Sequence, residues 1–269
     1  TAAGQTADFN IIPRPQQVNF SNDAPFTLSA KTVISLGTNS QDMKRNANML
    51  ASYIEQATGI RPAIGKSKNG TAIVLTIDKT IANAEGYKLD ADAKHIRIAG
   101  ASAAGVFYGI QTLRKSLPLV NGKASKVSIP AVHIADAPRF AYRGTHLDVS
   151  RHFVTADSVR QFIDMLALHN INRFHWHLTD DQGWRIEIKK YPLLTQIGSK
   201  RAQTVIGHNS GKYDGKPYSG FYTQKQIRDI VKYAADRYIT IVPEIDPPGH
   251  MQAALAAYPD MGCTGGPYE

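Results

Sequence analysis

The feature that most constrains the fold is a regular alternation of strand-like and helix-like segments in the second half of the chain. Three short segments rich in β-branched and aromatic residues alternate with two longer segments that carry apolar residues at helical spacing. The order strand, helix, strand, helix, strand is typical of a parallel sheet whose strands are joined by crossover helices. In chain order the five segments are 141–150, 155–170, 171–178, 223–238 and 239–245.

Each of the three expected strands ends in its most polar residues, in 146–151, 179–182 and 246–250. Parallel α/β folds place their ligand sites at the carboxyl ends of the strands, so we expect a site there. A (β/α)8 barrel needs eight strands and about 250 residues. Since only three strands are expected in 139–269, we predict an α/β domain that comprises the first three βα units of a truncated TIM barrel.

Residues 1–138 are expected to form a separate α+β domain. One segment with apolar residues at helical spacing ends at Gly59, and a second ends before Pro118. Strands that flank two helices predict a sheet with the helices packed on one face. The segment 121–140 contains Pro, Gly and Ser and is expected to be a connector. The expected strands of this domain are 26–36, 71–78, 86–92 and 94–100.

Composition argues against several classes of function. The formal net charge is +9, but the 31 lysines and arginines are scattered, without the basic stripe and interleaved aromatics of nucleic-acid-binding proteins. No run of about 18 apolar residues could span a membrane. The first ten residues lack the basic and apolar regions of a signal peptide. The lone cysteine, Cys263, excludes an internal disulfide framework and a thiolate zinc site; in a secreted protein it would hint at a partner outside this chain.

The motif with most polar groups is FHWHLTDDQGW, at 174–184. The two-residue period of a strand puts His175 and His177 on one face and Trp176 on the other. A His-x-His pair at a strand end holds metal in the amidohydrolase class of barrel enzymes, and His250 would then be a third ligand. We favour buried, hydrogen-bonded histidines and no metal, because no further histidine cluster with ligand spacing follows.

The adjacent carboxylates Asp180 and Asp181 fit either a turn before Gly183 or a site for sugars. Sugars offer hydroxyl groups for carboxylate and arginine contacts. Their apolar ring faces stack on aromatic side chains, and Trp184 would supply one. Arg143, from the first strand, is the candidate cation of such a site, and an interior salt bridge is its plainer role.

Asp246 and His250 follow the third strand and would lie at the same carboxyl edge of the sheet as the residues above. A histidine that is held by a carboxylate can orient or tune a general acid supplied from elsewhere. The alternative is that the intervening Pro-Pro-Gly sequence is only a rigid turn and that His250 begins a helix.

Taken together, three motifs resemble glycoside hydrolase family 20, the β-N-acetylhexosaminidases. They are YRGTHLDVSRHF (142–153), NRFHWHLTDDQGWRIEIKKYPLL (172–194) and VPEIDPPGHMQAALAAYPD with GCTGG (242–266), in the family's order. The resemblance implies a small α/β domain ahead of a catalytic barrel. It also implies a retaining, exo-acting hydrolase of terminal β-linked N-acetylglucosamine or N-acetylgalactosamine. In this family the substrate's own acetamido oxygen attacks the anomeric carbon and forms an oxazolinium ion.

The resemblance assigns roles to individual residues. Arg143 would bind ring hydroxyls of the sugar. Asp180 and His250 would form a supporting network behind the general acid, and Asp246 would lie beside that network. Asp181 and Trp184 complete the expected substrate-binding set. No cofactor is implied, the expected partners are glycans with terminal N-acetylhexosamine, and the expected location is secreted or periplasmic.

The family's catalytic Asp-Glu pair does not occur in this sequence. We therefore expect a fragment of a longer protein, inactive alone, with the partner of Cys263 in the remaining part. Two other functions stay open at this point. One is a glycan-binding or scaffolding fragment without activity, and the other is a metal-dependent barrel hydrolase that uses His175 and His177.

Overall fold

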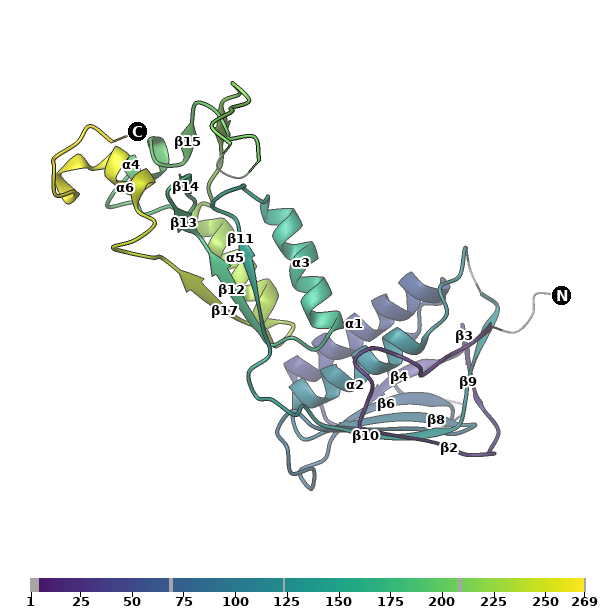
Figure 1. Ribbon diagram of the computed structural model, residues 1–269. Helices are drawn as coiled ribbons and strands as arrows, with labels where there is room; N and C mark the ends of the chain where they lie inside the picture. Colours follow the sequence, from purple (N-terminus) through teal and green to yellow (C-terminus); the bar gives the residue numbers. More distant parts are fainter. Residues whose placement is uncertain (1–4, 68–69, 123, 208–209, 269) are drawn as a thin grey trace. The chain divides into compact units, whose positions relative to one another are not determined.

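The computed structural model describes residues 5–67, 70–122, 124–207 and 210–268, which form two compact units (Figure 1). The first unit comprises Thr1–Ala141 with Ala167–Asn170. The second comprises Tyr142–Leu166 and Ile171–Glu269. The main division of the chain, between Ala141 and Tyr142, lies close to the boundary at 138 that the sequence predicts.

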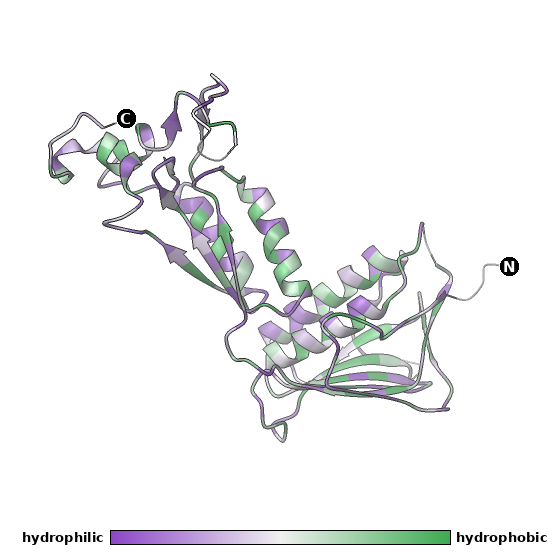
Figure 2. Ribbon diagram, viewed as in Figure 1, coloured by the Kyte–Doolittle hydropathy of each residue, from purple (hydrophilic) through white to green (hydrophobic). Residues whose placement is uncertain are grey.

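The first unit is built around a seven-stranded mixed sheet. Helices α1 (Gln41–Thr58) and α2 (Ala103–Ser116) lie side by side on one face of this sheet, as predicted (Figure 1). Figure 2 shows hydrophobic residues along the strands of the large sheet and along both helices. The strand order is β2 (Gln17–Phe20), β10 (Val132–Asp136), β7 (Tyr87–Ala91), β8 (His95–Gly100), β6 (Ala72–Ile77), β4 (Val33–Leu36) and β5 (Ala63–Ile64). A smaller sheet has the order β1 (Gln5–Thr6), β9 (Lys126–Ile129) and β3 (Phe26–Ser29).

The ends of α1 follow from local chemistry. Ser40 precedes the helix, and its hydroxyl accepts a hydrogen bond from Met43 N at 3.2 Å. This contact satisfies one of the helix's unpaired amides. At the other end Gly59 has a φ of 70°, a left-handed conformation that glycine adopts without strain, and its N–H donates to Glu55 O. The predicted stop at Gly59 is therefore confirmed.

Two predictions for the first unit are wrong. The expected connector 121–140 contains β9 and β10, and β10 lies between β2 and β7 in the large sheet. Alternating burial in 126–129 and 132–134 is the signal that the Pro, Gly and Ser content concealed. The expected strand 26–36 is two strands, because a turn between them is closed by a hydrogen bond from Thr32 N to Ser29 O.

The second unit contains the predicted parallel sheet, in the order β11 (Gly144–Asp148), β12 (Arg173–His177) and β17 (Thr240–Glu244). Helices α3 (Ala156–Leu168) and α5 (Gln224–Ala235) connect consecutive strands, which confirms the alternation read from the sequence. Each helix starts at a threonine cap: Ser158 N donates to Thr155 Oγ1, and Thr223 forms a capping box with Gln226.

The two faces of this sheet differ in chemistry. Phe174 and Trp176 on β12 are buried, and Trp176 packs against Tyr222 with ring centroids 4.8 Å apart. Alternate residues of the strand therefore point to opposite faces, and the histidines His175 and His177 lie on the other one. The prediction that Trp176 points away from the two histidines is confirmed.

Short elements follow the strands of the second unit. They are β13 (Thr179–Asp180), β14 (Gly183–Trp184), α4 (Leu193–Gln196), β15 (Lys200–Arg201), β16 (Tyr218–Ser219), α6 (Gln252–Ala257) and a 3-10 turn (Pro259–Met261). The single cysteine, Cys263, is exposed. Among the described residues, no helix has both the length and the apolar character that crossing a bilayer requires.

Candidate active site

Polar side chains gather at the carboxyl ends of the three parallel strands. Asp148, His177 and Glu244 are the last residues of β11, β12 and β17, and the sheet register pairs them with one another. Because residues in register point to the same face of a sheet, the three side chains lie together. The predicted location of the polar groups, at this edge of the sheet, is what the structure shows.

Asp180 is the centre of the cluster and is 1% exposed. Its Oδ2 contacts His177 Nε2 at 2.8 Å and Arg151 Nη2 at 2.7 Å. Its Oδ1 accepts from His250 Nδ1 at 3.1 Å and from the N–H of Asp181 at 2.7 Å. Four partners of this kind satisfy both oxygens of the carboxylate, so its orientation is fixed despite its burial.

His177 bridges two carboxylates. Its Nδ1 lies 2.7 Å from Glu244 Oε2, and its Nε2 lies 2.8 Å from Asp180 Oδ2. Only the doubly protonated ring can donate at both nitrogens. Burial opposes this charge, but the hydrogen bonds to Glu244 and Asp180 outweigh it and raise the pKa of His177 above its ordinary value. The geometry therefore favours an imidazolium between two carboxylates.

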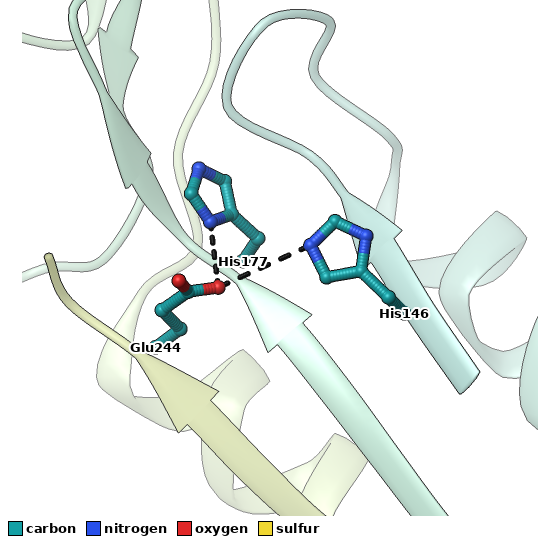
Figure 3. A group of neighbouring side chains, drawn as sticks. All are labelled: His146, His177 and Glu244. Atoms are coloured by element: carbon teal, nitrogen blue, oxygen red, sulfur yellow. Dashed lines mark hydrogen bonds and ion pairs between the residues drawn. The ribbon is translucent and has the colours of Figure 1, made fainter. Parts of the chain in front are cut away.

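Histidines from strands β11 and β12 lie close to the carboxylate of Glu244 on β17 (Figure 3). Its Oε2 lies 2.6 Å from His175 Nε2, 2.7 Å from His177 Nδ1 and 3.9 Å from His146 Nε2. Burial favours the neutral acid, but the hydrogen bonds to His177 and His175 prevail and lower the pKa of Glu244. Glu244 is thus held ionised beside the Asp180 network, to which His177 connects it.

Arg151 is the cation of this cluster. It follows β11, where Asp148 accepts hydrogen bonds from the N–H groups of Ser150 and Arg151 and so turns the chain back on itself. The guanidinium of Arg151 reaches Asp148 and Asp180, both at 2.7 Å. Burial alone would raise the pKa of Asp148, but its hydrogen bonds with Arg151 lower it. The side chain of Arg151 is 40% exposed, so it is only partly covered by the fold.

Arg143, by contrast, does not lie at the carboxyl edge of the sheet, so its predicted position is wrong. It directly precedes β11, and its backbone pairs with Asn172, which precedes β12. A strand rises about 3.3 Å per residue, so the α-carbons of Arg143 and Asp148 lie about 16 Å apart along it. The same sequence segment carries an arginine beyond each end of the strand, and the one on the site is Arg151.

Trp184 does not present a surface for stacking either. Its ring is 5% exposed and packs with Leu194 and the alanines of α6, and its Nε1–H donates to Ile186 O at 2.7 Å. The antiparallel pairing of β13 and β14 places Trp184 opposite Thr179 and directs its ring into this small core. The predicted stacking role of Trp184 is contradicted by its burial.

The remaining predicted residues lie beside Asp180. His250 adopts a left-handed backbone conformation with a φ of 51°, and its Nε2 lies 3.7 Å from Asp246 Oδ2. Asp181 is exposed and accepts a hydrogen bond from Gln252 N at the start of α6. The structure thus brings Asp180, His250 and Asp246 together as the sequence predicts, while their roles in a reaction stay predictions.

Arg185 supports the cluster from within the fold, and sequence reasoning did not single it out. It is fully buried and donates to three backbone carbonyls: Ser150 O at 2.7 and 3.2 Å, Ser199 O at 2.8 Å and Gly220 O at 2.9 Å. Burial lowers the pKa of Arg185 to about 10. By holding the carbonyl of Ser150, Arg185 fixes the turn from which Arg151 projects.

Two groups within the described residues have the spacing of metal ligands, and neither is the predicted set of His175, His177 and His250. One is His146, His177 and Glu244, and the other is Asp180, Asp181 and His250. The predicted set is not formed because His175 and His177 share Glu244, whereas His250 contacts Asp180.

A three-stranded parallel sheet with a buried carboxylate network at its carboxyl edge defines a candidate active site of the α/β class. The family description "Glycosyl hydrolase family 20, catalytic domain" matches residues 140–268, and "Glycosyl hydrolase family 20, domain 2" matches 8–137. The chain belongs to glycosyl hydrolase family 20, a family of enzymes.

Named relatives agree with this membership. A β-hexosaminidase from Porphyromonas gingivalis is 45% identical over 261 residues, which cover 94% of this chain and 32% of that protein. A β-hexosaminidase from Vibrio furnissii is 38% identical, with 96% and 41% covered. The chain therefore spans about a third to two fifths of the length of these two relatives.

Solved structures show the same fold. The family 20 β-N-acetylhexosaminidase from Streptomyces coelicolor A3(2) is 36% identical with a TM-score of 0.84, and the match covers 96% of this chain and 51% of that one. A mutant β-hexosaminidase from Streptomyces plicatus, in complex with its product GlcNAc, has the same identity and TM-score, with 96% and 50% covered. The predicted pairing of an α/β domain with a TIM-barrel-type domain is thereby confirmed.

Proposed function

We propose that the whole protein, of which these residues form part, is an exo-acting, retaining β-N-acetylhexosaminidase that removes terminal β-linked GlcNAc or GalNAc. The observation that carries the proposal is the buried Asp180, which holds Arg151 and His250 at the carboxyl edge of the sheet. An arginine and a histidine fixed on one carboxylate give a site both a binding group and a group that can act on a proton.

In this proposal the substrate supplies the nucleophile. Its 2-acetamido oxygen attacks the anomeric carbon, and an oxazolinium ion forms as the glycosidic bond breaks. The leaving oxygen needs a proton from a general acid. The 269 residues contain no adjacent Asp-Glu pair, so the acid and its aspartate neighbour would come from outside them. These residues alone would then be inactive.

His250 is proposed to position that general acid. Asp180 accepts a hydrogen bond from Nδ1–H of His250, which fixes the tautomer and directs Nε2 toward the side where Asp246 lies. A histidine fixed in this way can hydrogen-bond to the acid and tune its pKa. Asp181 is exposed and the side chain of Asp246 is 40% exposed, so both are proposed to contact substrate hydroxyls.

Arg151 takes the substrate-binding role that the sequence assigned to Arg143. Its guanidinium is held by two carboxylates, and its side chain is still 40% exposed. The planar fork of an arginine can donate to two adjacent oxygens at once, which suits a pair of neighbouring ring hydroxyls. Restraint of the fork by Asp148 and Asp180 reduces the entropy that sugar binding would remove.

The test is hydrolysis of p-nitrophenyl N-acetyl-β-glucosaminide by the whole protein, with the anomeric product followed by NMR. We expect the β-anomer of GlcNAc first, and no turnover of the matching β-glucoside, because the glucoside lacks the acetamido nucleophile. Folded whole protein that leaves both compounds intact would refute the activity. Equal turnover of the two would refute substrate assistance while leaving glycosidase activity in place.

The same resemblance leads us to propose a secreted or periplasmic location. Fractionation of cells that produce the whole protein, with activity measured in each fraction, checks this proposal. Activity confined to the cytoplasmic fraction would contradict it.

A further inference from the structure

The histidine His146 has no role in the Asp180 network, yet its imidazole is directed at Glu244 (Figure 3). Its Nε2 lies 3.9 Å from Glu244 Oε2, too far for a hydrogen bond. Among the described residues it makes no closer polar contact, and its neighbours are the rings of His175 and His177, with centroids 4.7 and 5.6 Å away. The 3.9 Å between this imidazole nitrogen and the carboxylate oxygen leaves room for an ion that binds both.

We propose that His146, His177 and Glu244 form a binding site for a divalent transition-metal ion, with Zn²⁺ as the preferred ion. Zn²⁺ binds imidazole nitrogen and carboxylate oxygen at about 2.0–2.2 Å, so two ligand atoms at a tetrahedral angle lie about 3.4 Å apart. The separations from Glu244 Oε2, 2.7 Å to His177 Nδ1 and 3.9 Å to His146 Nε2, bracket that value. Two histidines and one carboxylate leave the fourth position of the ion open to water.

Hydrogen bonds around these ligands match what a zinc site requires. A histidine ligand generally donates its other ring N–H to a carboxylate, which fixes its tautomer. His177 Nε2 meets Asp180 Oδ2 in this way, so Nδ1 is the nitrogen that would bind the metal. His175 Nε2 hydrogen-bonds to Glu244 and restrains its carboxylate. The carboxylate has a second oxygen, so it can bind the ion and keep this contact.

The ligands are also accessible. The side chain of His146 is 49% exposed and that of Glu244 is 28% exposed, whereas His177 lies beneath them at 6%. The other candidate group, Asp180 with Asp181 and His250, is less suited to an ion. That group offers one imidazole nitrogen and two carboxylates, and carboxylate ligands suit Mg²⁺ or Ca²⁺ better than Zn²⁺. The first group therefore combines access, two nitrogen ligands and a restrained carboxylate.

Metal binding would replace a proton. When Zn²⁺ binds Nδ1 of His177, the N–H bond at that atom breaks, the electron pair is donated to the metal and the proton leaves to solvent. The ion then takes the place of the hydrogen bond between His177 and Glu244. If the proposed hexosaminidase function holds, Zn²⁺ becomes an inhibitor, because the His177 ring that it binds also contacts Asp180 at 2.8 Å.

The test is direct Zn²⁺ titration of the untagged, metal-free whole protein in competition with a chromophoric chelator, without substrate. We expect one site that His146→Ala weakens at least about tenfold, because loss of even a partner of a ligand weakens metal binding about 10–100-fold. His133→Ala is the matched control: His133 is an exposed histidine beside a single carboxylate, Asp90, and its removal should leave the titration unchanged. Tetrahedral Co²⁺ absorption bands, absent in His146→Ala, give a second readout.

Equal Zn²⁺ affinity in wild type and His146→Ala would overturn the proposal, as would the absence of the Co²⁺ bands in wild type. Inhibition is measured separately. The Zn²⁺ concentration for half-inhibition should rise at least about tenfold in His146→Ala, in line with the loss of affinity. Metal binding without any hexosaminidase activity would refute the proposed function and leave the metal site standing.

Discussion

Replacement of the buried Arg185 by methionine tests whether a buried cation that donates its hydrogen bonds to backbone carbonyls stabilises the second unit. The arginine donates to Ser150 O, Ser199 O and Gly220 O, in three separate loops. Methionine fills a similar apolar volume but donates nothing, so Ser150 O and Gly220 O lose their partner, while Ser199 O keeps the 3.3 Å hydrogen bond from Gly220 N. The substitution therefore removes hydrogen bonds with little change of packing.

The expected loss is about 1 kcal/mol. An unpaired buried carbonyl costs about 2 kcal/mol, so two of them cost about 4 kcal/mol. The arginine itself is destabilised by burial, because its pKa falls from 12.5 to about 10. That shift corresponds to about 3 kcal/mol that methionine regains. Arg185→Lys should fall in between, since an ammonium keeps the charge but reaches fewer of the carbonyls.

Chemical denaturation followed by tryptophan fluorescence measures this difference in the 269-residue chain. Both of its tryptophans, Trp176 and Trp184, are buried in the same unit as Arg185. Arg160→Met is the control, because Arg160 pairs with the exposed Asp157 and should change the free energy of unfolding by less than about 0.5 kcal/mol. Unfolding of Arg185→Met at the wild-type denaturant concentration would refute the reasoning.

Three further predictions follow from individual residues. Arg151→Met in the whole protein should raise KM at least about tenfold, since it removes charged hydrogen bonds worth about 1.5–3 kcal/mol. The KM of Arg143→Met should stay within about twofold of the wild-type value. Equal effects of the two substitutions on KM would contradict the assignment of Arg151 as the binding arginine. Lys115→Met should stabilise the first unit by about 1–3 kcal/mol at pH 7, because burial lowers the pKa of Lys115 to about 8 and its ammonium has no hydrogen-bond partner. Between pH 8 and 10.5 the unfolded wild-type chain binds more protons than the folded one, so wild-type stability rises with pH there. The extra stability of Lys115→Met over wild type, measured by thermal denaturation, should therefore shrink across this pH range. A difference that stays constant with pH would contradict this account. Gly105→Ala should destabilise that unit by about 1–3 kcal/mol, because the added methyl group would overlap a backbone carbonyl of the preceding loop, and Gly65→Ala, where the space is open, is the control.

The period of apolar residues was sufficient to predict most of the architecture. Buried residues such as Val159 and Ile163 recur at helical spacing, and burial fixes that spacing physically. The direction of the strands alone was sufficient to predict that the site lies at the carboxyl edge of the sheet. The prediction of a connector at 121–140 is wrong because β9 and β10 are short and Pro130 separates them. Turn-forming residues therefore dominate the sequence pattern of this segment.

Side-chain direction at the site was not predictable from the sequence. Arg143 and Arg151 flank the same strand, and only the register of β11 with β12 shows which arginine lies at the carboxyl end. Trp184 follows two aspartates, but a tight two-strand pairing turns its ring into a local core. Arg185 gave no signal, because its partners are carbonyls from distant loops, and backbone carbonyls occur at every position of any sequence.

The place of β10 in the large sheet bears on how the first unit forms during synthesis. Among the described strands β2 pairs with β10 alone, with Val18 opposite Ile134, and β10 also covers the free edge of β7. Until residue 136 has left the ribosome, β2 has no partner and β7 offers open backbone groups to other chains. The unit therefore completes its sheet only when almost its whole sequence has been translated, and nascent chains that stall earlier would depend on chaperones to avoid aggregation.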